Sequence, residues 1–146
     1  GYRVTTTVFD ANVTVTNPDG DTTQYTVTVR TPMLRTAVED ETVGDAVESG
    51  WFETFERRLE DAPKATRASI NLESHSLTEQ SGQAVATFEF EYDNPTRAVE
   101  IAKTLVEYVE GTYAEGIVPG YPYRSPVIDL LQDARTDTDE YGGTPL

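Results

Sequence analysis

The only histidine of this 146-residue chain, His75, is the first candidate for chemistry because the hydroxyl side chains of Ser74 and Ser76 flank it. Catalysis of the Ser-His-Asp type needs a serine within hydrogen-bond reach of a histidine that a carboxylate orients. Apolar and polar residues alternate over 68–73, so His75 lies near the end of a predicted strand, where adjacent side chains point to opposite faces. Neither serine is then placed for activation by His75, and we expect a surface histidine at a hairpin edge.

Three carboxylates, Glu89, Glu91 and Asp93, recur at every second position of another predicted strand. Paired carboxylates can serve as general acid and base, and their oxygens can hold Mg²⁺ or Ca²⁺. The chain has 26 Asp and Glu against 11 Lys and Arg, so carboxylates are its ordinary surface residues. We therefore interpret this row as a solvated strand face.

No other pattern predicts catalysis or metal binding. Asp137, Asp139 and Glu140 resemble half of a calcium loop, but the glycine and the distant glutamate of such a loop are absent. The sequence has no Cys, and it has no phosphate-binding loop, dinucleotide fingerprint or zinc-ligand spacing. We predict no catalytic residue, no metal ligand and no cofactor, and we regard an enzyme as the less favoured alternative.

The segment 120–124 (GYPYR) carries the residue types that are enriched at binding hot spots, namely Tyr121, Tyr123 and Arg124. Tyr108 and Tyr113, on the helix predicted before this segment, complete the candidate binding residues. Two interpretations stay open. The segment is a connector whose tyrosines pack back on the sheet or helices, or it is a docking edge for a protein partner or a second copy of the chain.

The net charge of −15 comes with nine Arg and only two Lys. Such a surface repels itself in dilute buffer, whereas at about 1 M salt the Debye length shrinks to about 3 Å and only near neighbours interact. We therefore expect a halophilic protein, and the alternative is an acidic protein of ordinary salinity that binds a basic partner. The chain has no basic stripe that could neutralise phosphates, which argues against nucleic acid.

No apolar run approaches the about 20 residues of a membrane helix, and no signal peptide is visible. We therefore expect no membrane partner and a cytoplasmic location. The chain opens at Gly1 without a Met, which is compatible with a shortened N-terminus.

Hydropathy periods predict the elements that would position these residues. Turns are expected at 10–12, 17–20 and 79–82, where Asp, Asn, Pro, Ser and Gly gather. In chain order we expect strands at 2–8, 13–16 and 25–30, a helix at 43–59, strands at 68–73 and 84–92, a helix from Asn94-Pro95, and a short helix after Ser125-Pro126.

Both long helices carry local signals. The first has a capping box at Thr42–Asp45 and an apolar stripe every four residues from Val43 through Val47 to Leu59. The second ends at Gly111 or Gly116. Its apolar face is wider than one sheet surface needs because it includes Val99, Ala102, Val106 and Tyr113.

This order predicts an α+β fold, with an antiparallel sheet of about five strands and helices packed on one face. The order is βββ-α-ββ-α plus a short C-terminal helix, and the face rich in Thr and Glu should be bare. We expect a single domain over 1–135 and a disordered tail over 136–146.

The stretches TTTVFDANVTV, GWFETFERRLEDAPKATRA, FEFEYDNPTRAVEIAKTLVEYVEGTY and EGIVPGYPYR cover most of the chain up to Arg124. In these stretches the chain resembles a haloarchaeal family of uncharacterised proteins, which implies no activity and no catalytic residues. Members of that family have an additional N-terminal helical segment, consistent with a shortened start here. With that helix, the element order is similar to that of the small acidic chaperones of type III secretion, which are dimeric protein binders.

The leading hypothesis is a non-enzymatic cytoplasmic module that binds a protein partner or forms a homodimer. The alternative is an enzyme or small-ligand binder with a pocket between helix and sheet, using Trp51, Tyr92 or Tyr108 with a nearby carboxylate. An enclosed pocket with convergent polar groups would favour that alternative, and a filled core would oppose it.

Overall fold

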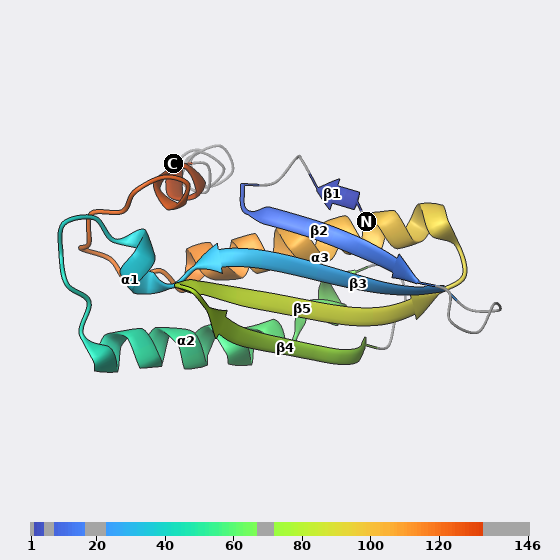
Figure 1. Ribbon diagram of the computed structural model, residues 1–146, viewed down its shortest axis with the longest axis horizontal. Coiled ribbons are helices and arrows are strands. Elements are labelled where there is room, and N and C mark those ends of the chain that lie inside the picture. The colour runs from blue at the N-terminus through green and yellow to red at the C-terminus, as the bar shows by residue number, and fades with distance from the viewer. Residues whose placement is uncertain (1, 5–7, 17–22, 67–71, 133–146) are drawn as a thin grey trace, which may run out of the picture.

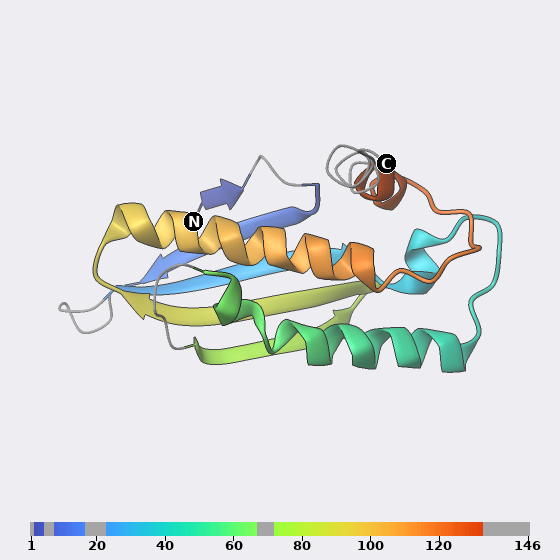
Figure 2. The same ribbon diagram turned by 180° about the vertical axis from the view of Figure 1, so that it is seen from behind.

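The computed structural model describes residues 2–4, 8–16, 23–66 and 72–132 of the chain. Its named elements in chain order are β1 (Tyr2–Val4), β2 (Asp10–Thr16), β3 (Thr23–Pro32), α1 (Leu34–Ala37), α2 (Asp45–Leu59), the 3-10 helix η1 (Ala62–Ala65), β4 (Leu72–Gln80), β5 (Gln83–Tyr92) and α3 (Pro95–Glu115). Residues 127–132 are helical as well, where the short C-terminal helix is predicted. The strands form an antiparallel sheet and α2 and α3 lie on one of its faces (Figures 1 and 2), which confirms the α+β class.

The sheet has the spatial strand order β1-β2-β3-β5-β4, and each neighbouring pair is antiparallel. The three-residue β1 covers only part of the outer side of β2. At the other end of the order, β4 has nine residues and pairs with β5 alone among the described strands. The sheet therefore has one short edge strand and one long edge strand.

Register sorts the strand side chains into a buried face and a bare face. Val27 of β3 lies opposite Val13 of β2 and Phe88 of β5, and all three are buried. The next residue of β3, Thr28, lies opposite Thr87 on the other face, where both are only half-buried. The helices cover the apolar face, so the Thr-rich face is the bare one, as the alternation predicts.

The start of β2 corrects the turn predicted at 10–12. The strand begins at Asp10, which pairs with Arg30 of β3. Ala11 and Val13 both take buried positions on the helix-covered face. Continuing the alternation through these two residues buries apolar surface that a turn would expose, and this gain outweighs the turn preference of Asp and Asn.

Some predictions lie outside the described residues, namely positions 5–7 of the strand at 2–8, the turn at 17–20, the first part of the strand at 68–73, and the tail at 136–146. The turn predicted at 79–82 is confirmed. Ser81 and Gly82 connect β4 to β5 with φ angles of 50° and 81°. Two successive positive φ angles are typical of the tight hairpin turn that matches strand twist.

The start of α2 differs from the predicted capping box. Gly44 is the N-cap, no side chain caps the first turn, and the helix begins at Asp45. Val47 is 39% exposed, whereas Trp51 and Phe55 are buried. Figure 1 gives the reason, because the N-terminal end of α2 projects beyond the end of β4 and has no sheet beneath it.

The predicted ends of α3 are confirmed. The Asn94 side chain accepts hydrogen bonds from the amides of Thr96 at 3.0 Å and Arg97 at 3.2 Å, with Pro95 as the first helical residue. Gly116 is the C-cap, which decides between the two predicted ends. Although α3 has 21 residues, no helix in the described ranges is apolar enough over sufficient length to cross a membrane.

The broad apolar face of α3 is used within the chain. Ala102, Val106 and Tyr113 are buried, and only Val99 among the widening residues is exposed, at 60%. The Tyr113 ring lies 4.9 Å from Phe9 and 5.5 Å from Trp51, centroid to centroid. The apolar surface that the sequence predicts as surplus is therefore mostly core.

Candidate functional site

The segment that carries three of the candidate binding residues runs alongside the stretch after α1. Tyr123 forms an antiparallel bridge with Val38 and is only 8% exposed. The Glu39 amide donates to the Pro122 carbonyl at 2.7 Å, and the Arg124 amide donates to the Ala37 carbonyl at 2.9 Å. These main-chain bonds hold the segment against the domain.

Side chains of the same segment are also engaged. The Tyr123 hydroxyl donates to the Val118 carbonyl, and burial raises the pKa of Tyr123 to about 12. Its ring lies 6.4 Å from that of Tyr121, which is half-buried. The Arg124 guanidinium donates to the Val38 carbonyl at 3.1 Å. The connector interpretation therefore describes Tyr123, while docking by Tyr121 and Arg124 stays a prediction.

Tyr113 lies in the core and not on a surface. Its ring has no exposed area, and its hydroxyl donates to the Pro32 carbonyl at 3.0 Å. Burial, and then the neighbouring Tyr123, raise the pKa of this phenol well above its ordinary value. The structure thus places Tyr113 near Tyr123, at the end of the sheet where β3 stops, but behind the protein surface.

Tyr108 belongs to a different surface, which we call the α2–α3 groove. Its hydroxyl donates to the carbonyl of Arg58, near the end of α2, at 2.9 Å. The ring is half-buried beside an open space of about 540 Å³. The residues that line the groove are Arg58, Asp61, Glu107, Tyr108, Gly111, Thr112 and Glu115.

Gly111 lines the groove without a side chain to fill it. Apart from the adjoining residues and backbone of α3 itself, a Cβ atom added to this residue would meet no atom within 4 Å in the described part of the chain. Glycine inside a helix costs about 0.5–1 kcal/mol relative to alanine, so its presence here has no explanation in the packing of the chain. An unexplained glycine inside a strongly periodic helix is the signal by which sequence reasoning could have found this position.

The charge of the groove is predominantly negative. Asp61, Glu107 and Glu115 supply three carboxylates, and the Lys64 ammonium lies 3.2 Å from Asp61. The Arg58 guanidinium lies toward the end of α3, with Nη1 3.6 Å from the place of a Cβ on Gly116. A cation there suits the negative end of a helix dipole. The rest of the groove is suited to a cationic group.

His75 lies apart from the groove, beside a small space between α2 and β4. It is opposite Phe88 in register, and Ser76 is opposite Thr87, so the two side chains point to different faces as predicted. The space measures about 130 Å³, and its lining includes Glu56 of α2 and Glu60, the C-cap of that helix. No hydrogen bond joins His75 to a serine or a carboxylate in the described part of the chain, and the geometry of a catalytic triad is not present there.

The predicted carboxylate row follows β5. Glu89 and Glu91 lie opposite Thr26 and Gln24 on the bare face, and Asp93 follows the last residue of the strand. Among the described residues, no group of three or more His, Asp or Glu side chains could hold a metal ion. The row therefore offers exposed charge and no assembled acid–base or metal site.

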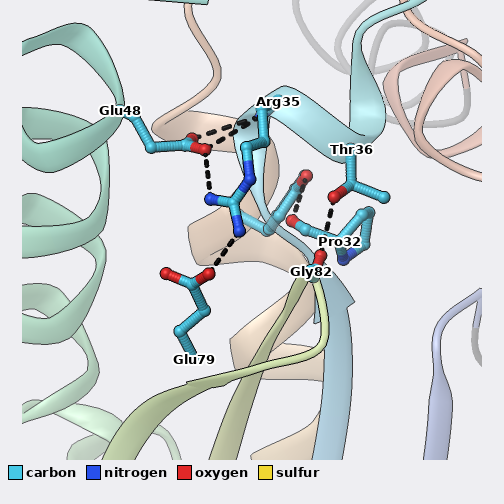
Figure 3. A network of polar contacts seen from close by, with 7 residues as sticks. Pro32, Arg35, Thr36, Glu48, Glu79 and Gly82 are labelled. Carbon is cyan, nitrogen blue, oxygen red and sulfur yellow. Dashed lines mark hydrogen bonds and ion pairs between the residues drawn. The ribbon is translucent and has the colours of Figure 1, made fainter. Parts of the chain in front are cut away.

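A polar network that sequence reasoning missed joins α1, α2 and the β4–β5 hairpin (Figure 3). The Arg35 guanidinium donates to Glu48 of α2 at 2.8 Å and also to Glu79 of β4. These hydrogen bonds, first that with Glu79 and then that with Glu48, raise the pKa of Arg35. The Gly82 carbonyl accepts from the Thr36 hydroxyl at 2.8 Å. The network positions the hairpin.

Glu110 is the one buried carboxylate among the described residues, at 8% exposure. It accepts a hydrogen bond from the Phe9 amide at 2.6 Å and so ties α3 to the segment before β2. Burial raises the pKa of Glu110, and the amides of Phe9 and Val8 oppose that rise. The carboxylate faces the backbone and lines none of the open spaces described above.

Comparison with known proteins gives one result. The model of a protein family described as "Family of unknown function (DUF5813)" matches residues 1–133. No curated protein and no solved structure has a significant match to the chain. These comparisons assign no role to any residue, so a function has to be argued from the surface itself.

Proposed function

The chain belongs to DUF5813, a family of unknown function, and we propose that it is a non-enzymatic protein-binding module whose α2–α3 groove takes a basic segment of a partner protein. The observation that carries this proposal is the open groove of about 540 Å³ beside Tyr108, with Gly111 as its floor. Three properties of the groove support the proposal: an aromatic side chain held in place, room for close approach, and negative charge.

The first reason is an aromatic anchor of restricted motion. The hydrogen bond from Tyr108 to the Arg58 carbonyl, 2.9 Å long, fixes the position of the ring before any partner arrives. A side chain held in its binding position loses little conformational entropy on association. Tyrosine and arginine are also the residue types that carry much of the binding energy in protein interfaces.

The second reason is room for close approach. Because Gly111 has no side chain and no other part of the described chain fills the place of a Cβ, the backbone of a partner can approach α3 closely here. Gly50 on α2 is equally open, and what distinguishes Gly111 is its place in the lining of the groove.

The third reason is charge. Glu107 and Glu115 line the groove on α3, and Asp61 lines it on the side of α2. A lysine or arginine of the partner can lie over the Tyr108 ring, where a cation–π contact contributes about 0.5–1 kcal/mol at an exposed site. The occupant that suits this surface is thus an exposed segment that carries a basic side chain.

An enzyme or a small-ligand binder has less support, although an open space of about 670 Å³ lies beside Tyr92, with Glu91 and Asp93 also in its lining. The space of about 130 Å³ between α2 and β4 is below the about 300–1,000 Å³ of typical ligand pockets. Trp51, which the alternative uses as a pocket residue, is 5% exposed and packs against Phe55 and Tyr113. We further propose that the module works in concentrated salt, because a net charge of −15 is tolerated best where it is screened.

Selection of short random peptides by display, in about 1 M KCl, tests the groove directly. We expect the selected peptides to contain Arg or Lys and to lose at least about tenfold in affinity, about 1.4 kcal/mol, for Gly111→Leu. Gly50→Leu is the matched control because Gly50 is also an exposed helical glycine with nothing within 4 Å of its Cβ, but it lies on α2 away from the groove. The proposal would be contradicted if the selected peptides bound Gly111→Leu as well as Gly50→Leu, or if they contained no Arg or Lys.

A further inference from the structure

The longest unpaired strand edge of the described chain belongs to β4. This strand pairs with β5 on one side, and no main-chain hydrogen bond of the described residues reaches its other side. Figure 1 shows β4 as the outermost strand of the sheet, with no element drawn beyond it in the plane of the sheet. An edge of this kind presents alternating amides and carbonyls that another strand can pair with.

The residue types of β4 do not prevent another strand from pairing with this edge. Proteins usually protect edge strands with lysine, proline, inward-pointing charges or very short length. Strand β4 has nine residues and contains neither Lys nor Pro. Between Ser74 and Gln80 its only acidic residue is Glu79, and Arg35 already forms an ion pair with it. In a chain with a net charge of −15, this is a stretch where an equally acidic molecule can approach with little repulsion.

We propose that β4 pairs with β4 of a second copy of the chain, antiparallel and about a two-fold axis at Leu77, so that the two sheets become one. This inference uses none of the residues of the α2–α3 groove, so its test is independent of the test of the function proposed for that groove. Two-fold pairing of identical antiparallel edges is isologous, so each strand supplies the complement of the other.

The avoidance of opposed carboxylates selects this register. With the axis at Leu77, His75 of one copy faces Glu79 of the other, and this contact occurs twice. Ser76 then faces Thr78, and Ser74 faces Gln80, so no carboxylate opposes a carboxylate along the paired stretch. Hydrogen bonds between polar side chains across strands stabilise a sheet, whereas like charges directly opposite each other destabilise it. The irregular register between Leu72 and Ser74 limits regular pairing to the part of β4 that follows it.

Light scattering after size exclusion, in about 1 M KCl, measures whether the full chain is a dimer. We expect a dimer, and a monomer at all concentrations up to about 1 mM, which is the Kd of a barely stable complex, would overturn the inference. Two proline variants, His75→Pro and Ser76→Pro, then test the edge. Adjacent residues of an antiparallel strand direct their amides to opposite sides, so one of these two prolines removes an outward amide and leaves the pairing with β5 intact.

The proline variant that keeps the thermal midpoint of the parent monomer is the informative one, and we expect its dimer dissociation constant to rise about tenfold or more. A folded proline variant that dimerises as tightly as the parent would overturn the inference. Thr14→Pro on β2 is the control for a proline on an exposed strand residue away from β4, and it should leave the dimer intact.

Cysteine exchange tests the register without depending on stability. The chain has no natural Cys, so each disulfide comes from introduced residues. A mixture of Ser76→Cys and Thr78→Cys proteins, treated with oxidised glutathione, should yield a disulfide-linked heterodimer, and each protein alone should not. Linkage in Ser76→Cys alone, or none in the mixture, would contradict pairing about Leu77.

Discussion

The hydroxyl of Tyr113 donates a 3.0 Å hydrogen bond to the main-chain carbonyl of Pro32 and so joins the last turns of α3 to the end of β3. Both partners lie beside the point where the chain enters α1, and the Arg35 network begins three residues later. The contact therefore positions the end of the sheet from which both the hairpin anchor and the bridge to Tyr123 start.

Removal of this hydroxyl should destabilise the protein. We expect Tyr113→Phe to lower the free energy of unfolding by about 1 kcal/mol, because a buried hydrogen bond is lost while the ring contacts remain. Tyr108→Phe is the matched control. Its hydroxyl bonds the Arg58 carbonyl near solvent, and water can replace it, so the expected change is within about 0.5 kcal/mol. Urea unfolding at constant salt measures both, and equal effects would contradict this assignment.

Glu110 should make stability depend on pH. Because burial raises its pKa in the folded state, the folded chain binds a proton at pH values where the unfolded chain, with an ordinary glutamate pKa of about 4.3, has released it. The stabilisation from this group is fully present below that unfolded value and is lost as the pH rises through the folded value. We expect Glu110→Gln, which keeps an oxygen for the Phe9 amide, to unfold at a higher temperature than the parent at pH 7.

The comparison for Glu110 is Glu100→Gln, which removes the same charge from an exposed position of α3. The difference in thermal midpoint between the two variants should shrink as the pH falls below about 4.3, because Glu110 is then protonated in the parent protein as well. If Glu110→Gln and Glu100→Gln give the same midpoint at every pH, the raised pKa of Glu110 has no consequence for stability.

Glycine replacements should have opposite effects at different positions. At Gly82, φ is +81° and a Cβ would lie 3.0 Å from the Thr36 hydroxyl oxygen, so we expect Gly82→Ala to destabilise the protein by about 1–2 kcal/mol. At Gly50 and Gly111 a Cβ meets nothing within 4 Å, and alanine should stabilise each helix by about 0.5–1 kcal/mol. Thermal unfolding of the three variants checks both signs, and a stabilising Gly82→Ala would contradict the turn geometry.

The excess of carboxylates should make stability depend on salt. Dilution from about 1 M to about 0.1 M KCl lengthens the Debye length from about 3 Å to about 10 Å, so carboxylates that were screened begin to repel one another. With a net charge of −15, we expect the thermal midpoint to fall steadily over this range. A series at matched concentrations of KCl and of uncharged sucrose separates screening from general effects on hydration. A midpoint that does not change with KCl would rule out a halophilic adaptation.

Several features of the fold could be predicted because their causes are local. The Asn94 cap and Pro95 at the start of α3 depend on backbone groups within a few residues, whereas for the end of α3 the sequence indicated Gly111 or Gly116. Alternation in β3 and β5 likewise assigns a face to Val27 or Phe88 without knowledge of the neighbouring strand. The turn predicted at 10–12 was wrong because the pairing of Asp10 with Arg30 is a long-range interaction that overrides a local preference.

The candidate binding residues also show the difference between what local patterns predict and what long-range packing decides. Tyr108, Tyr113 and Tyr123 look alike as residue types near a predicted helix, yet one lines a groove and two are buried. Which of them is accessible depends on where α2 and the segment after α1 pack, and no pattern within α3 reports that. Arg58 and Gly111 were missed because the groove exists only where the end of α2 meets α3.

The sequence by itself determined the α+β class, the N-terminal cap of α3, the strand faces and the net negative charge, since composition and short-range periodicity are properties of neighbouring residues. Only the tertiary structure decided that β4 is the unguarded edge, that Tyr113 is core and that Tyr108 lines a groove. These outcomes depend on contacts between residues distant in the chain, and such contacts form wherever the whole set of apolar faces is buried most completely.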